Sequence, residues 1–111
     1  MKLPRPYETF KRAHPEIWKA YDQLGALSSR AGPLDRKSTE LIKLAMAIGA
    51  GMEGAVHSHT RRALEAGATR AELSHVVLLG VTTLGFPSMM AAKTWVEDEL
   101  GKRPVRSRRR G

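Results

Sequence analysis

Two histidines near the middle of the chain are the residues with the clearest chemical potential. His57 and His59 lie one residue apart in the segment GMEGAVHSHTRRALEAG, which spans residues 51–67. Histidine is a frequent general acid or base at neutral pH and a frequent metal ligand. The segment is therefore compatible with a metal site, with an acid/base site, or with a helix that merely carries two histidines.

Helical geometry separates the two side chains. Successive residues of an α-helix are rotated by about 100°, so His57 and His59 lie roughly 200° apart and cannot both point into one small site. Histidine pairs that bind zinc on a helix are spaced three or four residues apart, because only those positions share a face. We therefore predict no metal site here, and nothing in the sequence indicates a cofactor.

His59 is the better candidate for a partly buried site. It shares a helix face with Met52 and Ala55, which are apolar or small. His57 lines up instead with charged residues such as Arg61, and we expect it on a solvated face. A single histidine on an apolar face is also compatible with a hydrogen-bonded core or interface residue, and the spacing alone leaves both interpretations open.

Glu40 is the candidate partner of His59. It lies beside the apolar stripe of a helix predicted over residues 35–50, next to Leu41 and one turn before Leu44. A carboxylate near an imidazole orients the ring and raises its basicity, as acid/base catalysis requires. The alternative is a surface glutamate near a helix N-terminus, where its charge suits the helix dipole.

Turn and cap signals place the other elements. A short helical turn over residues 7–13 precedes a long helix over 14–29, and Asp35 is a good N-cap for the helix over 35–50. The latter should bury a stripe of Leu41, Leu44, Ala45 and Ile48. A helix from Met52 or Glu53 to Ala66 is followed by Gly67. The sequence TRAE at residues 69–72 predicts a capping box, and the last helix runs to a terminal signal at Gly101.

The helix that begins near Arg70 is unusually apolar. Its body, LSHVVLLGVTTLG, has apolar residues almost all the way round, which predicts burial on several sides. A small monomer cannot easily provide that much burial.

Composition restricts the class of protein. A chain of 111 residues is long enough for one domain with a core, which we place at residues 1–101. The chain has no cysteine, which excludes disulfides, thiolate nucleophiles, thiol peroxidase chemistry by this chain alone and cysteine-ligated zinc. No apolar run approaches the roughly 20 residues of a membrane span, and the N-terminus lacks the pattern of a signal peptide. We expect a cytoplasmic protein with no membrane contact.

The net charge of +8 is concentrated at one end. Residues 1–101 hold 13 Lys and Arg against 11 Asp and Glu, and the remaining six positive charges lie in residues 102–111, KRPVRSRRRG. We predict that this tail is disordered. It either solubilises the chain or makes weak contact with polyanions, and nothing in its sequence indicates base-specific recognition.

Residues 33–95 resemble the carboxymuconolactone decarboxylase family, which includes the alkylhydroperoxidase D-like proteins. The resemblance rests on joint spacing: a KxxELIxLA helix at residues 37–45, a histidine eight residues before a glycine (His59 and Gly67), then GATRAEL and a downstream GFP. In the peroxidase-like branch a glutamate stands twelve residues before the first cysteine of a Cys-x-x-Cys pair, and a histidine four residues after the second. These positions correspond here to Glu40 and His59.

The two cysteine positions of that branch correspond to Met52 and Ala55 in this chain. A thioether and a methyl group can neither form a disulfide nor attack a peroxide. The resemblance therefore implies a member without peroxidase activity. The decarboxylase branch works without the thiol pair, which implies that Glu40 and His59 could serve acid/base chemistry, with Met52 and Ala55 lining the pocket.

The resemblance also implies an all-α fold, a compact bundle of about five to six helices of the alkylhydroperoxidase D type. It implies a homotrimer or a homohexamer of stacked trimers, with the site near subunit interfaces. Such assembly would account for the apolar surface of the helix near Arg70.

Three functional hypotheses follow. The first is a cofactor-free acid/base enzyme, a carboxy-lyase acting on a small carboxylated lactone or keto acid, with Glu40 orienting His59 and a cation binding the carboxylate. The conceivable cations are Arg36, Lys37, Arg61 and Arg62. The second is a catalytically inactive binding or scaffold oligomer. The third, redox work through the thiols of another protein or a bound cofactor, has the least support because the sequence supplies no redox group.

Overall fold

The structure, a computed structural model, describes residues 3–102, in which the helices are joined by turns and short loops and no strand occurs. The helices are α1 (Arg5–Ala13), α2 (Pro15–Arg30), α3 (Arg36–Gly49), α4 (Glu53–Glu65), α5 (Arg70–Thr83) and α6 (Phe86–Gly101). The predicted all-α class is thus confirmed. The chain divides into two compact units, Met1–Leu34 and Asp35–Gly111, and the single domain expected over residues 1–101 remains a prediction. Apart from Lys102, the basic tail lies outside the described residues.

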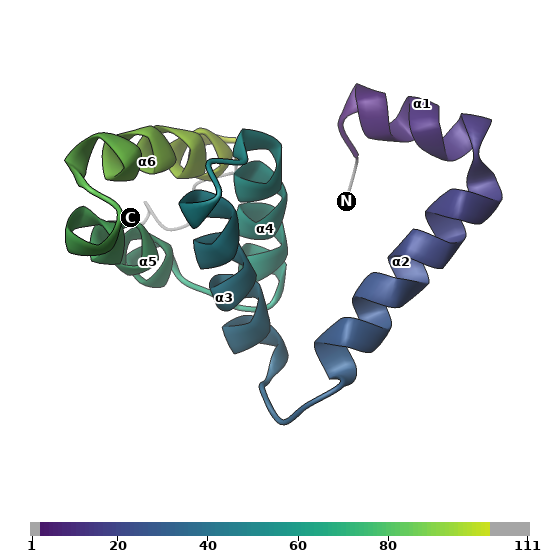
Figure 1. Ribbon diagram of the computed structural model, residues 1–111, viewed down its shortest axis with the longest axis horizontal. Helices are drawn as coiled ribbons and strands as arrows, with labels where there is room; N and C mark the ends of the chain where they lie inside the picture. The colour runs from purple at the N-terminus through teal and green to yellow at the C-terminus, as the bar shows by residue number, and fades with distance from the viewer. Residues whose placement is uncertain (1–2, 103–111) are drawn as a thin grey trace, which may run out of the picture. The chain divides into compact units, whose positions relative to one another are not determined.

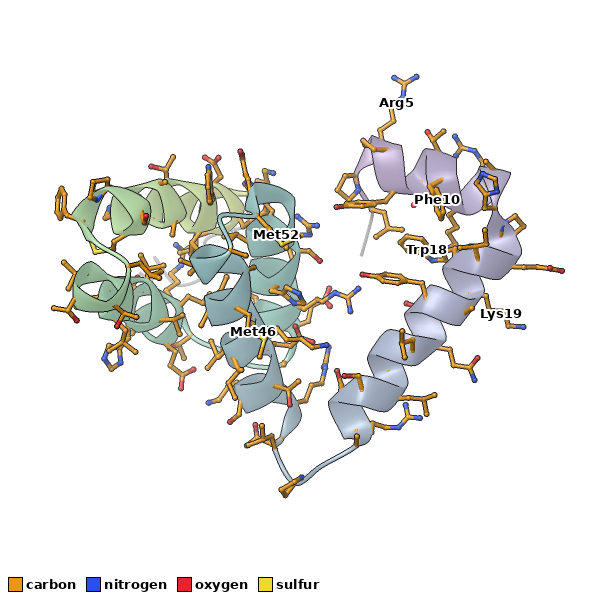
Figure 2. The ribbon with its side chains drawn as sticks, viewed as in Figure 1. Arg5, Phe10, Trp18, Lys19, Met46 and Met52 are labelled. Carbon is orange, nitrogen blue, oxygen red and sulfur yellow. The ribbon has the colours of Figure 1, made fainter. Side chains whose placement is uncertain are left out.

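The first unit consists of α1 and α2, joined at His14. Aromatic side chains link the two helices: the ring centroids of Tyr7 and Trp18 lie 6.4 Å apart, and those of Phe10 and Trp18 lie 6.5 Å apart. Figure 2 shows Phe10 and Trp18 on facing parts of the two helices. Neither helix contains a buried residue. Two helices alone therefore supply aromatic contacts but no closed core.

The second unit holds the hydrophobic core. Helices α3 and α4 lie side by side, and α6 packs on α4 and α5 (Figure 1). The core is built from apolar residues of all four helices, with Leu44, Val56, Leu73, Ala92 and Val96 almost completely buried. Gly51, at φ 68°, makes the turn between α3 and α4. This turn brings the candidate residues of α3 and α4 next to each other.

The predicted cap signals are confirmed. The Asp35 carboxylate accepts a hydrogen bond from the backbone N–H of Ser38 at 2.7 Å. Thr69 and Glu72 form the complete capping box, at 3.0 and 2.9 Å. Gly67 has the expected left-handed conformation, at φ 98°. The last helix ends at Gly101, as expected, but Gly101 is its final residue and does not have the left-handed conformation of a glycine that follows a helix.

The buried stripe of α3 differs from the expected one at one position. Leu44 and Ile48 are buried and Leu41 is partly buried, but Ala45 is exposed and Ala47 is buried instead. Ala45 lies about 100° past Leu44 around the helix, which takes it off the stripe. Ala45 joins Ile42 and Met46, both exposed, on an outer apolar face of α3; Figure 2 shows Met46 on this helix.

Helix α5 buries one face in this chain. Leu73, Val77 and Gly80 face the core, whereas Leu78 and Leu79 are 57% and 59% exposed. The burial on several sides that the sequence predicts does not occur within the single chain. Among residues 3–102, no helix is both long enough and apolar enough to cross a membrane.

Candidate functional site

Helix α4 packs between α3 and α6 and carries one histidine on each flank of its buried face. Val56, Thr60 and Ala63 form that buried face. His59 lies on the flank toward α3 and His57 on the flank toward α6. The two rings therefore point to different neighbours, as the spacing of two predicts.

His59 contacts Glu40 of α3. Its Nδ1 lies 2.9 Å from Oε1 of Glu40, whose side chain is 8% exposed, while that of His59 is 23% exposed. An ionised carboxylate can only accept, so Nδ1–H donates this bond. In the neutral ring the lone pair is then on Nε2, and Nε2 has no hydrogen-bond partner among residues 3–102.

Glu40 stays ionised despite its burial. Burial alone would raise the pKa of Glu40, but the hydrogen bond from His59 and the positive charges of His59, Arg62 and Lys43 hold this pKa below its ordinary value. The carboxylate can therefore accept a hydrogen bond from Nδ1–H whether His59 is neutral or protonated. This fixes the orientation of the ring in both states.

His57 forms a second histidine–glutamate pair. Its Nδ1 lies 2.6 Å from Oε2 of Glu99, and its side chain is only 17% exposed. The expectation that His57 lies on a solvated face is wrong, because α6 crosses this flank and places Glu99 against the ring. Nε2 of His57 faces Glu53 at 3.3 Å, so carboxylates contact both ring nitrogens.

Glu99 is the most buried acidic residue of the described chain, with a side chain 2% exposed. Burial would raise the pKa of Glu99, but hydrogen bonds from His57 and Lys102 and the charges of Arg61 and Lys102 lower it below its ordinary value. Arg61 and Lys102 each approach the same carboxylate oxygen at 3.2 Å. The cluster ties α4 to the end of α6.

The sequence interpretation missed Glu99, although a signal for it exists. Glu99 follows Ala92 and Val96 at the spacing of the buried face of α6, so a carboxylate stands in phase with core residues. A buried acid near a helix C-terminus opposes the helix dipole and requires cations nearby. That requirement points to a charged partner, but the partner, His57, is 42 residues away in sequence.

Met52 and Ala55 occupy the positions of the absent thiols. Met52 immediately precedes α4 and is 57% exposed, and Ala55 packs against the edge of the core; Figure 2 shows Met52 at this end of the helix. A cavity of about 320 Å³ lies elsewhere in the same unit and is lined mainly by the end of α3 and the start of α6, including Gly51, Ser88 and Trp95. Neither Met52, Ala55, His59 nor Glu40 lines this cavity.

The four conceivable carboxylate-binding cations differ in their partners. Arg36 lies 4.0 Å from Glu65, Lys37 lies 3.0 Å from Glu72, and Arg61 lies 3.2 Å from Glu99. Within the described part of the chain, Arg62 makes no hydrogen bond and no ion pair. Arg62 therefore has the only guanidinium or ammonium of the four that is not already engaged by a carboxylate there.

No group of three or more acidic or histidine side chains able to hold a metal ion is gathered within residues 3–102. His57 and His59 are each held by a different glutamate. The chemistry that this arrangement can perform is proton transfer at Nε2 of His59, backed by the Glu40 carboxylate.

Comparison with known proteins gives a family match along most of the chain. Residues 15–98 match the model of the carboxymuconolactone decarboxylase family. An uncharacterised protein of Cupriavidus necator is 29% identical over 91 residues, which cover 82% of this chain and 80% of the relative. The crystal structure of a carboxymuconolactone decarboxylase family protein of Legionella pneumophila, in its apo form, superimposes with a TM-score of 0.73 at 28% identity, over 86% of each chain.

The family match spans most of the chain and includes α3 and α4, with Glu40 and His59. The absence of cysteine sets this member apart from thiol-dependent relatives. The chain belongs to the carboxymuconolactone decarboxylase family.

Proposed function

We propose that the chain is a cofactor-free carboxy-lyase acting on a small carboxylated lactone or keto acid, with His59 as the proton donor. The observation that carries the proposal is the difference between the two histidine–glutamate pairs. His57 has a carboxylate on both ring nitrogens, whereas His59 is held by one nitrogen only. Nε2 of His59 is thus available to exchange a proton with a substrate.

The proposed step balances in atoms and charge. The bond between the substrate carbon and its carboxylate breaks, and carbon dioxide leaves. The electron pair passes into the neighbouring carbonyl as an enolate. Protonated His59 then delivers the Nε2 proton to that carbon and becomes neutral, and solvent restores the proton. Glu40 accepts from Nδ1 throughout and stabilises the protonated ring.

Asparagine substitutions test this role without removing the contact to the glutamate. The side-chain N–H of Asn stands near the position of Nδ1–H but cannot titrate. We expect His59→Asn to lower the rate of carbon dioxide release about 10²- to 10⁴-fold, the usual contribution of a positioned acid or base. The assay uses a panel of carboxylactones and keto acids. His57→Asn is the matched control and should retain activity.

Glu40→Gln separates orientation from proton transfer. The Gln amide can donate to Nδ1 as well as accept from it, which permits the tautomer with the proton on Nε2. Because the amide is neutral, it also stabilises the protonated form of the ring less than the carboxylate does. We expect a smaller loss of rate than for His59→Asn and a changed pH profile. Equal rates for wild type and His59→Asn on every substrate that is turned over would reject the proposed role.

A second candidate function is a catalytically inactive binding or scaffold protein. Two observations favour it: His57 also contacts a buried glutamate through Nδ1, in a tying role, and the 320 Å³ cavity is not lined by His59 or Glu40. In this case no panel substrate is turned over, and His59→Asn changes the stability or assembly of the protein instead.

A further inference from the structure

Arg62 is the cation best placed to act together with His59. It follows His59 by three residues on α4, a spacing at which side chains are neighbours on one helix face. Arg62 is half-buried, and its charge acts on the Glu40 carboxylate that holds the His59 ring. By helical geometry Arg62 lies on the same flank of α4 as His59, the flank on which His59 contacts Glu40 of α3.

Arg62 differs from the neighbouring Arg61 in its contacts with carboxylates. Arg61 turns to the opposite flank and pairs with the buried Glu99, where it compensates a structural charge. Arg62 compensates no carboxylate by direct contact within residues 3–102. A half-buried guanidinium has five donors in a planar fork that suits a carboxylate, so this position has an unused capacity to bind an anion.

The proposed reaction decides which anion Arg62 can usefully bind. The carboxylate that leaves becomes neutral carbon dioxide, so a cation fixed on it would stabilise the substrate more than the transition state and slow the reaction. A cation on a carboxylate that the substrate keeps has no such cost. It contributes binding energy and positions the reacting carbon.

We propose that Arg62 binds a carboxylate that the substrate retains and thereby places the reacting carbon at Nε2 of His59. This inference rests on the proposed function. It makes Arg62 a specificity-determining residue, because substrates with a second carboxylate are favoured over those that carry only the one they lose. The site is formed by one face of α4, with His59 and Arg62 one turn apart.

Kinetics test the role through the balance of KM and kcat. For a substrate with two carboxylates, we expect Arg62→Gln to raise KM at least tenfold, the effect of losing one charge-assisted contact, with a smaller change in kcat. Arg62→Lys should restore part of the affinity because it keeps the charge but not the fork. Arg36→Gln removes the same charge from the same unit and should leave KM unchanged.

A binding measurement tests the anion site without turnover. The ring signals of His59 are followed by nuclear magnetic resonance in the full-length protein while glutarate, with two carboxylates, or butyrate, with one, is added. We expect glutarate to shift the His59 signals at lower concentration than butyrate. Arg62→Gln should weaken glutarate binding at least tenfold and remove its advantage over butyrate, whereas Arg36→Gln should not.

The two proposals fail in different ways. If glutarate binds through Arg62 but no carboxylactone or keto acid is decarboxylated, the anion site stands and the proposed reaction is rejected. If glutarate leaves the His59 signals of the wild-type protein unmoved at high millimolar concentration, or if Arg62→Gln binds it as the wild type does, the role of Arg62 is overturned. Equal weakening in Arg36→Gln would also overturn it, because general charge would then explain the effect.

Discussion

At the scale of single residues, two histidines on one helix differ in what their second ring nitrogen contacts. Both donate from Nδ1 to a glutamate with a side-chain exposure below a tenth. The Glu53 carboxylate contacts Nε2 of His57, whereas no residue of the described chain forms a hydrogen bond with Nε2 of His59. A histidine–glutamate pair can therefore link two helices, as His57 and Glu99 do, or leave one ring nitrogen able to exchange a proton, as in His59.

Glu99 provides a test of the tying role. Replacing Glu99 by Gln leaves Arg61 and Lys102 without their counter-charge, and His57 loses its ionised acceptor. Removing one partner of a buried ion pair typically destabilises a protein by about 3–5 kcal/mol, and we expect the low end because Gln keeps the volume and one acceptor. Urea unfolding at neutral pH measures the loss.

The pH dependence of the same variant has a defined sign. The folded-state pKa of Glu99 lies below its ordinary value, so the unfolded chain binds more protons in the interval between the two. The stabilisation is complete above the ordinary pKa of a glutamate and is lost as pH falls through the lower folded-state pKa. Glu99→Gln should flatten this acid-side loss of the free energy of unfolding.

The matched control is Glu97→Gln on the same helix. Glu97 pairs with Lys93 at 2.6 Å, but both side chains are about half exposed, and surface pairs of this kind contribute at most about 1 kcal/mol. A loss in Glu99→Gln no larger than in Glu97→Gln would contradict the tying role.

At this scale, a contact between motif positions can be predicted from the sequence, whereas a contact that depends only on the tertiary fold cannot. The motif positions pair Glu40 with His59, and in the structure Oε1 of Glu40 lies 2.9 Å from Nδ1 of His59. The pairing of His57 with Glu99 depends on how α6 crosses α4, which no local spacing encodes. The charged neighbours of His57 on its own helix therefore do not predict its burial against α6.

At the scale of elements, the predicted helix starts follow from local chemistry. Asp35 and Thr69 each satisfy backbone N–H groups that a helix start leaves unpaired, and both caps are formed as expected. These signals involve residues three apart, so they can be recognised without knowledge of the fold. The exposed position of Ala45 could not be predicted in this way. Helix α3 is apolar on more than one side, and periodicity alone does not identify which side faces the core.

The capping box at the start of α5 gives the prediction at this scale. Thr69→Ala removes the acceptor of the Glu72 backbone N–H and should destabilise the protein by about 0.5–2 kcal/mol. For a domain of this size, 1 kcal/mol corresponds to a fall in Tm of about 4–8 °C. Thermal unfolding followed by circular dichroism measures the change. Thr69→Ser keeps the hydroxyl and should remain near the wild type; equal losses in both variants would show that the cap is not the cause.

At the scale of the whole molecule, a single chain leaves large apolar side chains exposed on two of its helices. The outer face of α5 presents Leu78 and Leu79, and the outer face of α3 presents Ile42 and Met46, all exposed. Burial of a large aliphatic side chain contributes about 1.5–3 kcal/mol, so covering these faces would release substantial free energy. Symmetric self-association is the common means of doing so, and we propose that the chain forms a homotrimer or a homohexamer.

Leu79→Glu tests this proposal. A glutamate at the outer face of α5 would have to be buried without a partner in an assembly, which costs far more than the lost apolar contact, but it is readily solvated in a single chain. We expect light scattering after gel filtration to show a multiple of the chain mass for the wild type and a smaller species for Leu79→Glu. Thr94→Glu adds the same charge to an exposed, polar part of α6 and should leave the mass unchanged. A monomeric wild type at micromolar concentration would refute the proposal, and an unchanged mass for Leu79→Glu would place the contact on another face.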